Sequence, residues 1–226
     1  MWFIITLMVF IIVRKVCGII RSPLFNPLLV SLAVLIPLLV TLNVSYETYY
    51  ADNQWVTWLL QPAVVALAYP LYEQLPQIRR NWKLILVSCT LGSVLSMLST
   101  VLFALLLDVD FELLASLMGK SVTTPIAMEI ASFLGGVPAI AAIMVLIAGL
   151  VGAILAYPIY RLFNIKSPIS RGLTMGCVSH ALGTATSAEK NTQDAAFSSL
   201  SLVICGVVTS IAAPIIMSTV IWLTTQ

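Results

Sequence analysis

The sequence predicts an all-α polytopic membrane protein with about six transmembrane helices and two broken or re-entrant helical hairpins. Of its 226 residues, 60% are hydrophobic and only 9% are charged, and the mean hydropathy is +1.06. A soluble domain carries about 25% charged residues. The charged residues fall in short clusters between long apolar runs, so no polar stretch can bury a core of its own. A water-soluble fold is excluded, and residues 1–226 are predicted to form one membrane domain.

Several apolar windows reach or approach the roughly 20 residues that a helix needs to cross the hydrocarbon core. They are roughly Trp2–Ile20, Leu28–Val44, Val56–Leu75, Leu84–Leu107, Val137–Tyr160 and Ala195–Leu223. Pro37, Pro62 and Pro70 are expected to kink the second and third of these spans, because proline removes a backbone hydrogen bond.

The first apolar run starts at Met1 without a basic segment before it. It is followed by Arg14 and Lys15 rather than by a small-residue cleavage site, which favours a retained first helix over a signal peptide. The two basic side chains can reach the membrane surface from the end of such a helix.

Two stretches between the spans are too polar and too rich in glycine and proline to be simple helices. They are Phe111–Gly136 and Ser170–Asp194, and each has two short helix-competent runs separated by a break. This pattern is typical of a re-entrant hairpin or a discontinuous helix. Two breaks approaching the midplane from opposite faces would suit an inverted-repeat transporter, although the sequence shows no strong repeat.

The distribution of charge selects a topology. If Phe111–Gly136 dips in and out on one side, the positive-inside rule is met. The basic residues that then lie on the cytoplasmic face are Arg14, Lys15, Arg21, Arg79, Arg80, Lys83, Arg161, Lys166 and Arg171. A full crossing would move Arg161, Lys166 and Arg171 outside and spoil that sorting. We therefore expect six spans with both termini outside, plus one hairpin entering from each face.

The first hairpin is predicted to turn within the run Lys120-Ser121-Val122-Thr123-Thr124-Pro125. Pro125 suits the first position of a helix and Thr124 suits its N-cap. A half-helix that starts there would point free N–H groups inward, an arrangement that binds anions. Lys120 would add a positive charge to this site. The alternative is that Lys120 lies near the membrane surface and reaches the lipid headgroups, while the threonines only cap the helix.

The second hairpin contains the run Ser179-His180-Ala181-Leu182-Gly183-Thr184-Ala185-Thr186. Gly183 can end one half-helix, and Thr186 with Glu189 has the spacing of a capping box that starts the next. His180, the only histidine, could contact a substrate or exchange a proton near neutral pH. It could equally be a packing residue.

Three further polar groups are weaker candidates. Glu129 follows Pro125 by four residues and could pair with Lys120 or couple proton movement, and Glu189 could act similarly at the second hairpin. Gln61 and Pro62 form a polar break in the third span. A structural kink is the favoured interpretation of that break, with a substrate contact as the alternative.

Enzymatic patterns are absent from the sequence. It has no nucleophile elbow, no Gly-rich phosphate loop and no spacing typical of a metal cluster. Cys17, Cys89, Cys177 and Cys205 lie far apart along the chain and are expected to be free thiols. The net charge of +2 does not suggest nucleic acid. We expect a protein without enzymatic activity, metal or cofactor.

Several long strings resemble one known family. They are LLQPAVVALAYPLYEQL (Leu59–Leu75), KSVTTPIAMEI (Lys120–Ile130), SHALGTATSAE (Ser179–Glu189), FNPLLVSLAVLIP near the start and AFSSLSLVICGVVTS near the end. These strings resemble the LrgB/CidB family, and within it the YohK-type inner-membrane proteins of bacteria. The resemblance runs from about Phe25 to the C-terminus. Glu129 departs from the small residues expected after KSVTTPIAM, which argues against a family-wide role for it.

The resemblance implies two different functions. LrgB/CidB proteins act as modulators of murein hydrolase activity and autolysis together with a small holin-like LrgA/CidA (YohJ-type) membrane partner. A related plastid protein exports glycolate and exchanges glycerate, and some bacterial pairs are linked to pyruvate movement.

From the sequence we favour a carrier for small carboxylates such as glycolate, glycerate or pyruvate. The organic anion would be held between the two hairpin tips by helix N-termini and by Lys120, Ser121, Thr123, Thr124, Pro125, Ser179, His180, Gly183, Thr184 and Thr186. The alternative is a holin/antiholin-type component that modulates murein hydrolase export through its LrgA-like partner. Homo-oligomers are compatible with either function.

Overall fold

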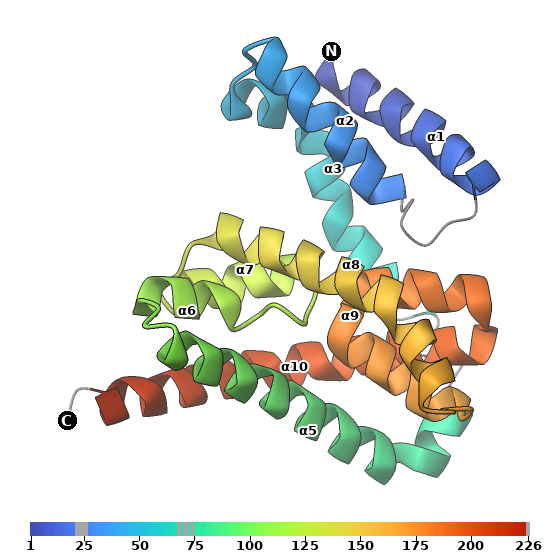
Figure 1. The fold of residues 1–226 in the computed structure, drawn as a ribbon, viewed down its shortest axis with the longest axis vertical. Helices are drawn as coiled ribbons and strands as arrows, with labels where there is room; N and C mark the ends of the chain where they lie inside the picture. The colour runs from blue at the N-terminus through green and yellow to red at the C-terminus, as the bar shows by residue number, and fades with distance from the viewer. Residues whose placement is uncertain (21–26, 67–68, 70–71, 73–74, 225–226) are drawn as a thin grey trace. The chain divides into compact units, whose positions relative to one another are not determined.

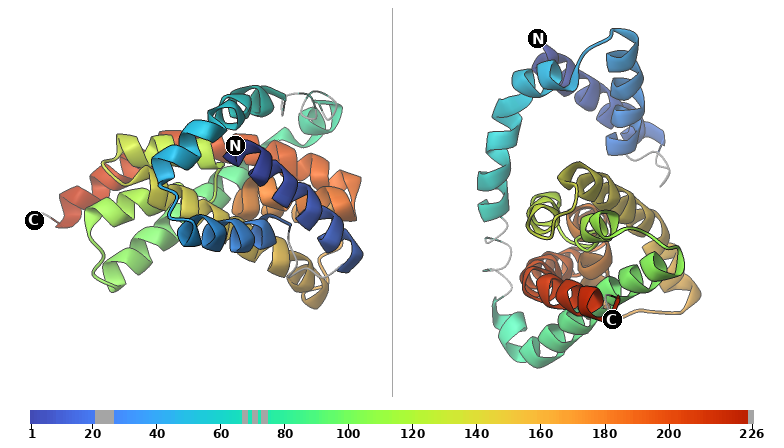
Figure 2. Two further views of the ribbon diagram at one scale, coloured as in Figure 1. Left: turned by 90° about the horizontal axis from the view of Figure 1, so that it is seen from above. Right: turned by 90° about the vertical axis from the view of Figure 1, so that its left-hand side faces the viewer.

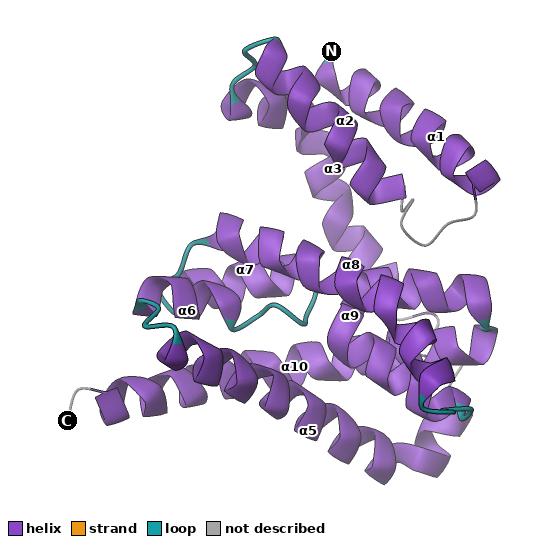
Figure 3. Ribbon diagram, viewed as in Figure 1, coloured by secondary structure: helices purple, strands orange, loops and turns teal. Residues whose placement is uncertain are grey.

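A computed structural model describes residues 1–20, 27–66, 69, 72 and 75–224, and within these residues the secondary structure is helical with no strand (Figure 3). Four helices of the described part are long and apolar enough to cross a membrane, at Trp2–Ile19, Arg79–Leu106, Pro138–Leu162 and Thr192–Thr224. The chain is therefore an all-α, multi-pass membrane protein, as the composition predicted.

The helices follow one another in the order shown in Figure 1: α1 (Trp2–Ile20), α2 (Pro27–Thr41), α3 (Tyr46–Ala66), α5 (Leu75–Leu106), α6 (Phe111–Leu117), α7 (Thr124–Phe133), α8 (Pro138–Leu162), α9 (Pro168–Lys190) and α10 (Thr192–Thr224). They belong to two compact units, residues 1–68 and residues 69–226, which are described separately.

Unit 1 contains α1, α2 and α3, and α1 packs on both of the other helices. The start of α1 is fastened to α3: the terminal ammonium of Met1 and the backbone N–H of Trp2 each lie 2.9 Å from Oδ2 of Asp52. The Trp2 N–H bond and the ammonium hold the pKa of the Asp52 carboxyl below its usual range. One turn further along α1, the hydroxyls of Thr6 and Tyr49 are 2.8 Å apart.

The apolar windows predicted the helices of unit 1 with one clear error. Helix α3 begins at Tyr46, although its apolar window begins at Val56. The more polar residues before Val56, Glu47 among them, are already helical. Pro37 and Pro62 lie inside α2 and α3 as expected. Pro70 lies outside the described residues.

Unit 2 alternates long helices with broken hairpins. The α6–α7 hairpin connects the end of α5 to the start of α8, and α9 connects the end of α8 to the start of α10. The two hairpins are therefore attached to opposite ends of α8. Helix α10 packs on α9 and α5, and α8 packs on α7 and α9 (Figure 2). The order long helix, hairpin, long helix, hairpin, long helix is compatible with an inverted repeat. The inverted repeat itself stays a prediction.

The surface of α8 shows how a helix of this unit is shared between lipid and protein. Its exposed side carries Ile143, Ile147, Val151 and Leu155 at four-residue spacing, and each of these side chains is about half exposed. The opposite side is formed by small residues, with Ala141, Val145 and Gly149 buried against the rest of the unit. Such an exposed apolar stripe suits contact with lipid chains.

The interior of unit 2 contains two clusters of buried side chains. The larger one lies between the α6–α7 hairpin and α5, α8 and α10, and includes Met97, Leu114, Met118, Val145 and Met217. The smaller one joins α5, α9 and α10. Its members are Ile85, Cys89, Leu173, Cys177, Phe197, Leu200 and Cys205, so three of the four cysteines meet although they are far apart in the sequence.

Candidate functional site

The first hairpin breaks where the sequence predicted. Helix α6 ends at Leu117 and α7 begins at Thr124, with Pro125 in its first turn. The N-cap, however, is Thr123 and not Thr124, because the carbonyl of Thr123 accepts the first helical bond, from the N–H of Ala127 at 2.9 Å. The Thr123 hydroxyl makes no capping bond. It is buried without a hydrogen-bond partner within the described structure.

Lys120 fastens the tip of this hairpin to α5. Its ammonium donates to the carbonyl of Ser96 at 2.9 Å, to the Ser96 hydroxyl at 3.1 Å and to the hydroxyl of Thr100. The neighbouring Ser121 hydroxyl lies 2.8 Å from the same Ser96 hydroxyl. The three protons of the ammonium therefore all have acceptors within the chain.

The expected ion pair between Lys120 and Glu129 is not formed. The side chain of Glu129 is on the exposed side of α7, while the Lys120 ammonium is directed to α5. The ion pairs found among the described residues are those of the Met1 ammonium with Asp52 and of Arg171 with Asp194. A role of Glu129 in coupling stays a prediction.

The second hairpin is formed within α9, and its chain reverses at His180. This residue has φ +40° and ψ −130°, which no helix contains. Beyond it the chain folds back: a Cβ added to Gly183 would lie 2.8 Å from the carbonyl oxygen of Met175, although residues eight apart in a straight helix are about 12 Å apart. The discontinuous helix is confirmed.

The position of the reversal differs from the prediction. It lies at His180, and Gly183 does not end a half-helix. Gly183 serves close packing instead, because a Cβ there would approach the Cβ of Ser179 to 2.6 Å. The predicted capping box of Thr186 and Glu189 is also wrong. The Thr186 hydroxyl is inside the second half-helix and donates to the carbonyl of Leu182 at 3.0 Å, and Glu189 is exposed.

His180 and Ser179 pack against α8. The Nε2 atom of His180 lies 2.9 Å from the carbonyl oxygen of Val145, so Nε2 carries the proton and donates it. Gly149 and Gly152 make this approach possible, since a side chain at either position would collide with His180 or Ser179. His180 is 3% exposed. The hydroxyl of Ser179 is buried without a partner within the described structure.

Thr184 connects the reversal to α10. Its hydroxyl donates to the carbonyl of His180 at 3.0 Å and lies 2.8 Å from the hydroxyl of Ser198. A Cβ on Gly176, in the first half-helix, would also meet the backbone of Ser198. Both halves of α9 therefore contact the same stretch of α10.

The two remaining candidates lie in unit 1. Gln61 and Pro62 are in the helical stretch of α3, and Pro62 is exposed. The side chain of Gln61 lies outside what the structure describes. Their predicted kink or substrate contact therefore stays a prediction.

The tips of the two hairpins lie against different helices, Lys120 on α5 and His180 on α8. Unit 2 has an apolar cavity of about 270 Å³ between α5 and α10. A second cavity, of about 210 Å³, is lined by Tyr157, Tyr160, Arg161, Asn164, Ile165, Lys166 and Arg171. Neither of these cavities is lined by a predicted site residue.

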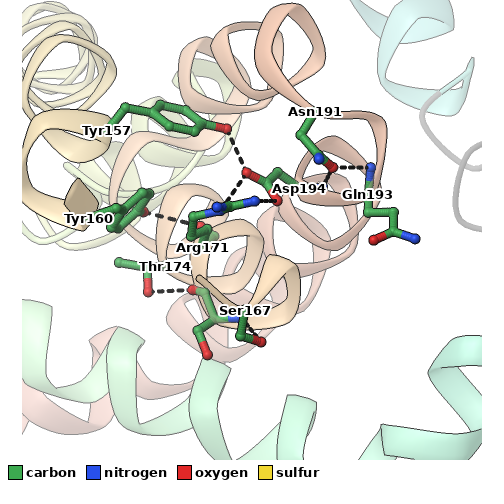
Figure 4. Close-up of polar contacts among 9 residues, drawn as sticks. Tyr157, Tyr160, Ser167, Arg171, Thr174, Asn191, Gln193 and Asp194 are labelled. Atoms are coloured by element: carbon green, nitrogen blue, oxygen red, sulfur yellow. Dashed lines mark hydrogen bonds and ion pairs between the residues drawn. The ribbon is translucent and has the colours of Figure 1, made fainter. Parts of the chain in front are cut away.

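Sequence reasoning missed one buried polar cluster, which joins the ends of α8, α9 and α10 (Figure 4). Asp194 is fully buried, and its carboxylate accepts from Nε and Nη2 of Arg171 at 2.9 and 3.0 Å and from the hydroxyl of Tyr157 at 2.9 Å. The hydroxyl of Tyr160 donates to the carbonyl of Arg171 at 3.1 Å. The sequence did contain a signal for this cluster, because the acidic residue Asp194 directly precedes the last apolar run.

Comparison with known proteins gives a consistent assignment. The sequence model of the LrgB-like family matches residues 6–219, which span both units. A protein of Haemophilus influenzae described as uncharacterized is 44% identical over 87% of this chain and 85% of its own.

Two named relatives are more distant. The holin-like protein CidB of Staphylococcus epidermidis is 31% identical over 93% of this chain and 92% of its own. The antiholin-like protein LrgB of Bacillus cereus is 32% identical over 86% of this chain and 84% of its own. No solved structure matches this one. Since the family match covers nearly the whole sequence and these relatives align over most of their length, the chain belongs to the LrgB-like family.

Proposed function

We propose that this chain is a holin/antiholin-type component of the bacterial inner membrane, which modulates murein hydrolase export and autolysis together with a small LrgA-like membrane partner. The observation that carries this proposal is the similarity, over nearly the full length of both proteins, to relatives named holin-like CidB and antiholin-like LrgB. These names support this function more directly than they support the carboxylate carrier favoured from the sequence.

The polar groups at the hairpin tips are consistent with this proposal. Lys120 is satisfied by Ser96 and Thr100, and His180 is satisfied by Val145. Buried polar groups that find partners within their own chain can hold an architecture together without any ligand. In this proposal the hairpins brace unit 2, and the exposed apolar faces of its long helices are available to lipid or to a small membrane partner.

Lysis measurements test the proposal. The chain is expressed in a bacterium that lacks its own LrgB-type protein, with and without the small partner. Murein hydrolase activity in the medium and the rate of autolysis are then followed. We expect the chain to change both quantities, and the change to require the partner. Unchanged autolysis in the presence of both proteins, at confirmed membrane levels, would contradict this function.

A carrier for small carboxylates is the second candidate, and a specific observation favours it. Each hairpin break holds a buried hydroxyl without a partner, that of Thr123 beside Lys120 and that of Ser179 beside His180. An unsatisfied buried hydroxyl is costly, and a bound ligand, ion or water can supply the missing bond. In this proposal a carboxylate accepts hydrogen bonds from these groups and from the free N–H groups at the start of α7.

Uptake measurements separate the two candidates. Vesicles containing the purified chain, with and without the partner, are given labelled glycolate, glycerate or pyruvate. A carrier should accumulate at least one of them, and Lys120→Ala and Thr124→Ala should abolish uptake while inserting normally. Thr219→Ala is the matched control, because Thr219 is exposed and its hydroxyl donates only to its own helix at Ile215. Absence of uptake by the intact pair would remove the carrier candidate.

A further inference from the structure

Three sulfur atoms meet in the interior of unit 2, from three different helices. They belong to Cys89 of α5, Cys177 of α9 and Cys205 of α10, and all lie within 4.8 Å of one another. The side chains are 0%, 8% and 1% exposed, and the shortest separation joins the sulfurs of Cys177 and Cys205 at 3.0 Å. Three free thiols at this spacing form a potential set of soft ligands.

The surroundings hold this cluster in place. The hydroxyl of Ser201 donates to the carbonyl of Leu173 at 2.8 Å and lies 3.0 Å from the sulfur of Cys177 and 3.5 Å from that of Cys89. On the side of α5, Gly92 leaves room for Cys177, because a Cβ at Gly92 would approach the Cys177 sulfur to 3.2 Å. The Ser201 hydroxyl and the space at Gly92 thus place the Cys177 sulfur beside those of Cys89 and Cys205.

We propose that Cys89, Cys177 and Cys205 bind one soft metal ion, Cu(I), with three sulfur ligands. Sulfur ligands select Cu(I) and zinc among the common metals. Zinc in a structural site requires four ligands from Cys, His or carboxylate side chains, and among the described residues this cluster offers three. A set of three sulfur ligands therefore suits Cu(I) better than zinc.

The geometry requires little movement for such an ion. Metal–sulfur bonds of about 2.3 Å in a trigonal arrangement place the sulfurs about 4 Å apart. The shortest separation here is 3.0 Å and all separations are below 4.8 Å, so shifts of side-chain torsions are sufficient. Each thiol that becomes a thiolate on binding releases its proton to solvent.

An occupied site would connect α9 to α5 and α10 just before the reversal at His180. Cys177 lies three residues before His180 and is the only one of the three ligands on α9. The ion would therefore fix the first half of α9, and this effect does not depend on which transport or lysis function the chain performs.

Titration of the purified full-length chain in detergent with Cu(I), in competition with a chromophoric Cu(I) chelator, tests the proposal. We expect one ion per chain. Cys177→Ser should weaken the binding by more than about tenfold, since loss of a direct ligand exceeds the loss of an outer-shell partner. Cys17→Ser is the matched control, because Cys17 is a buried free cysteine of α1 outside the cluster.

A second measurement does not depend on the variants folding. X-ray absorption at the copper edge of the unaltered, Cu(I)-loaded chain should show three sulfur neighbours at about 2.3 Å, one from each of Cys89, Cys177 and Cys205. Absence of Cu(I) binding, equal loss of binding in Cys17→Ser, or a copper ion with fewer than three sulfur neighbours would overturn the proposal. A Cys177–Cys205 disulfide formed in place of the metal complex, lighter by two hydrogen atoms, would also overturn it.

Discussion

The ring of His180 occupies the space that a side chain on Gly149 would need. A Cβ at Gly149 would lie 2.6 Å from both Cε1 and Nε2 of that ring, and Nε2 is itself bonded to the carbonyl of Val145 one helical turn earlier. The absence of a side chain at Gly149 thus leaves the space that the ring occupies at the reversal of α9.

Gly149→Ala should therefore displace His180 and destabilise unit 2. Overpacking of this kind costs about 1–3 kcal/mol, which thermal unfolding in detergent should detect as a lower melting temperature. Gly18→Ala is the control, since nothing lies within 4 Å of a Cβ there and alanine suits a helix interior. Equal melting temperatures for the two variants would mean that α8 and α9 are not in contact at His180.

Asp194→Asn should destabilise the chain more than any comparable change to an exposed carboxylate. Asp194 is fully buried, and its removal leaves the guanidinium of Arg171 without its charged partner. Breaking a buried ion pair costs about 3–5 kcal/mol, and the partial exposure of Arg171 favours the lower end of that range. The matched substitution Asp52→Asn removes a carboxylate that pairs with the exposed Met1 ammonium, and it should leave the melting temperature nearly unchanged.

Ser116→Ala should loosen the connection between the first hairpin and α8. The Ser116 hydroxyl accepts from the backbone N–H of Val137 at 2.7 Å and donates to the carbonyl of Glu112 at 2.8 Å. An unsatisfied buried N–H costs about 1–3 kcal/mol, and hydrogen exchange at the start of α8 should accelerate. Ser99→Ala, at an exposed hydroxyl that bonds only within its own helix, should change neither stability nor exchange.

Thr123→Val should keep or raise the melting temperature. The Thr123 hydroxyl is buried without a partner in the described structure, so an apolar group of the same shape removes an unsatisfied polar atom and loses no bond. If the carboxylate carrier is the correct function, the same variant should nevertheless lose uptake, because the missing hydroxyl contacts the substrate. A lower melting temperature would show that the hydroxyl has a structural partner.

Composition and apolar length predicted the class of fold and the position of most helices. Trp2–Ile20 coincides with α1, and the windows for α8 and α10 end within a few residues of the observed helices. The two polar stretches also identified both broken hairpins, because Gly, Pro and Thr within an apolar chain mark places where the backbone leaves the helix.

Local rules failed where distant contacts decide the geometry. Gly183 has the properties of a helix end, yet the reversal occurs at His180 because Gly149 and Val145 of α8 provide the space and the acceptor there. Likewise, a pair with Lys120 was one of the two alternatives for Glu129, and Lys120 is bonded to α5 instead. The convergence of Cys89, Cys177 and Cys205 could not be predicted, since nothing in their spacing relates α5 to α9 and α10.

Because the hairpins are attached to opposite ends of α8, both are connected through this one helix. Ser116 holds the N-terminal end of α8 through Val137, and His180 holds its middle through Val145. Because both hairpins are bonded to α8, a tilt or rotation of this helix would move the two hairpins together.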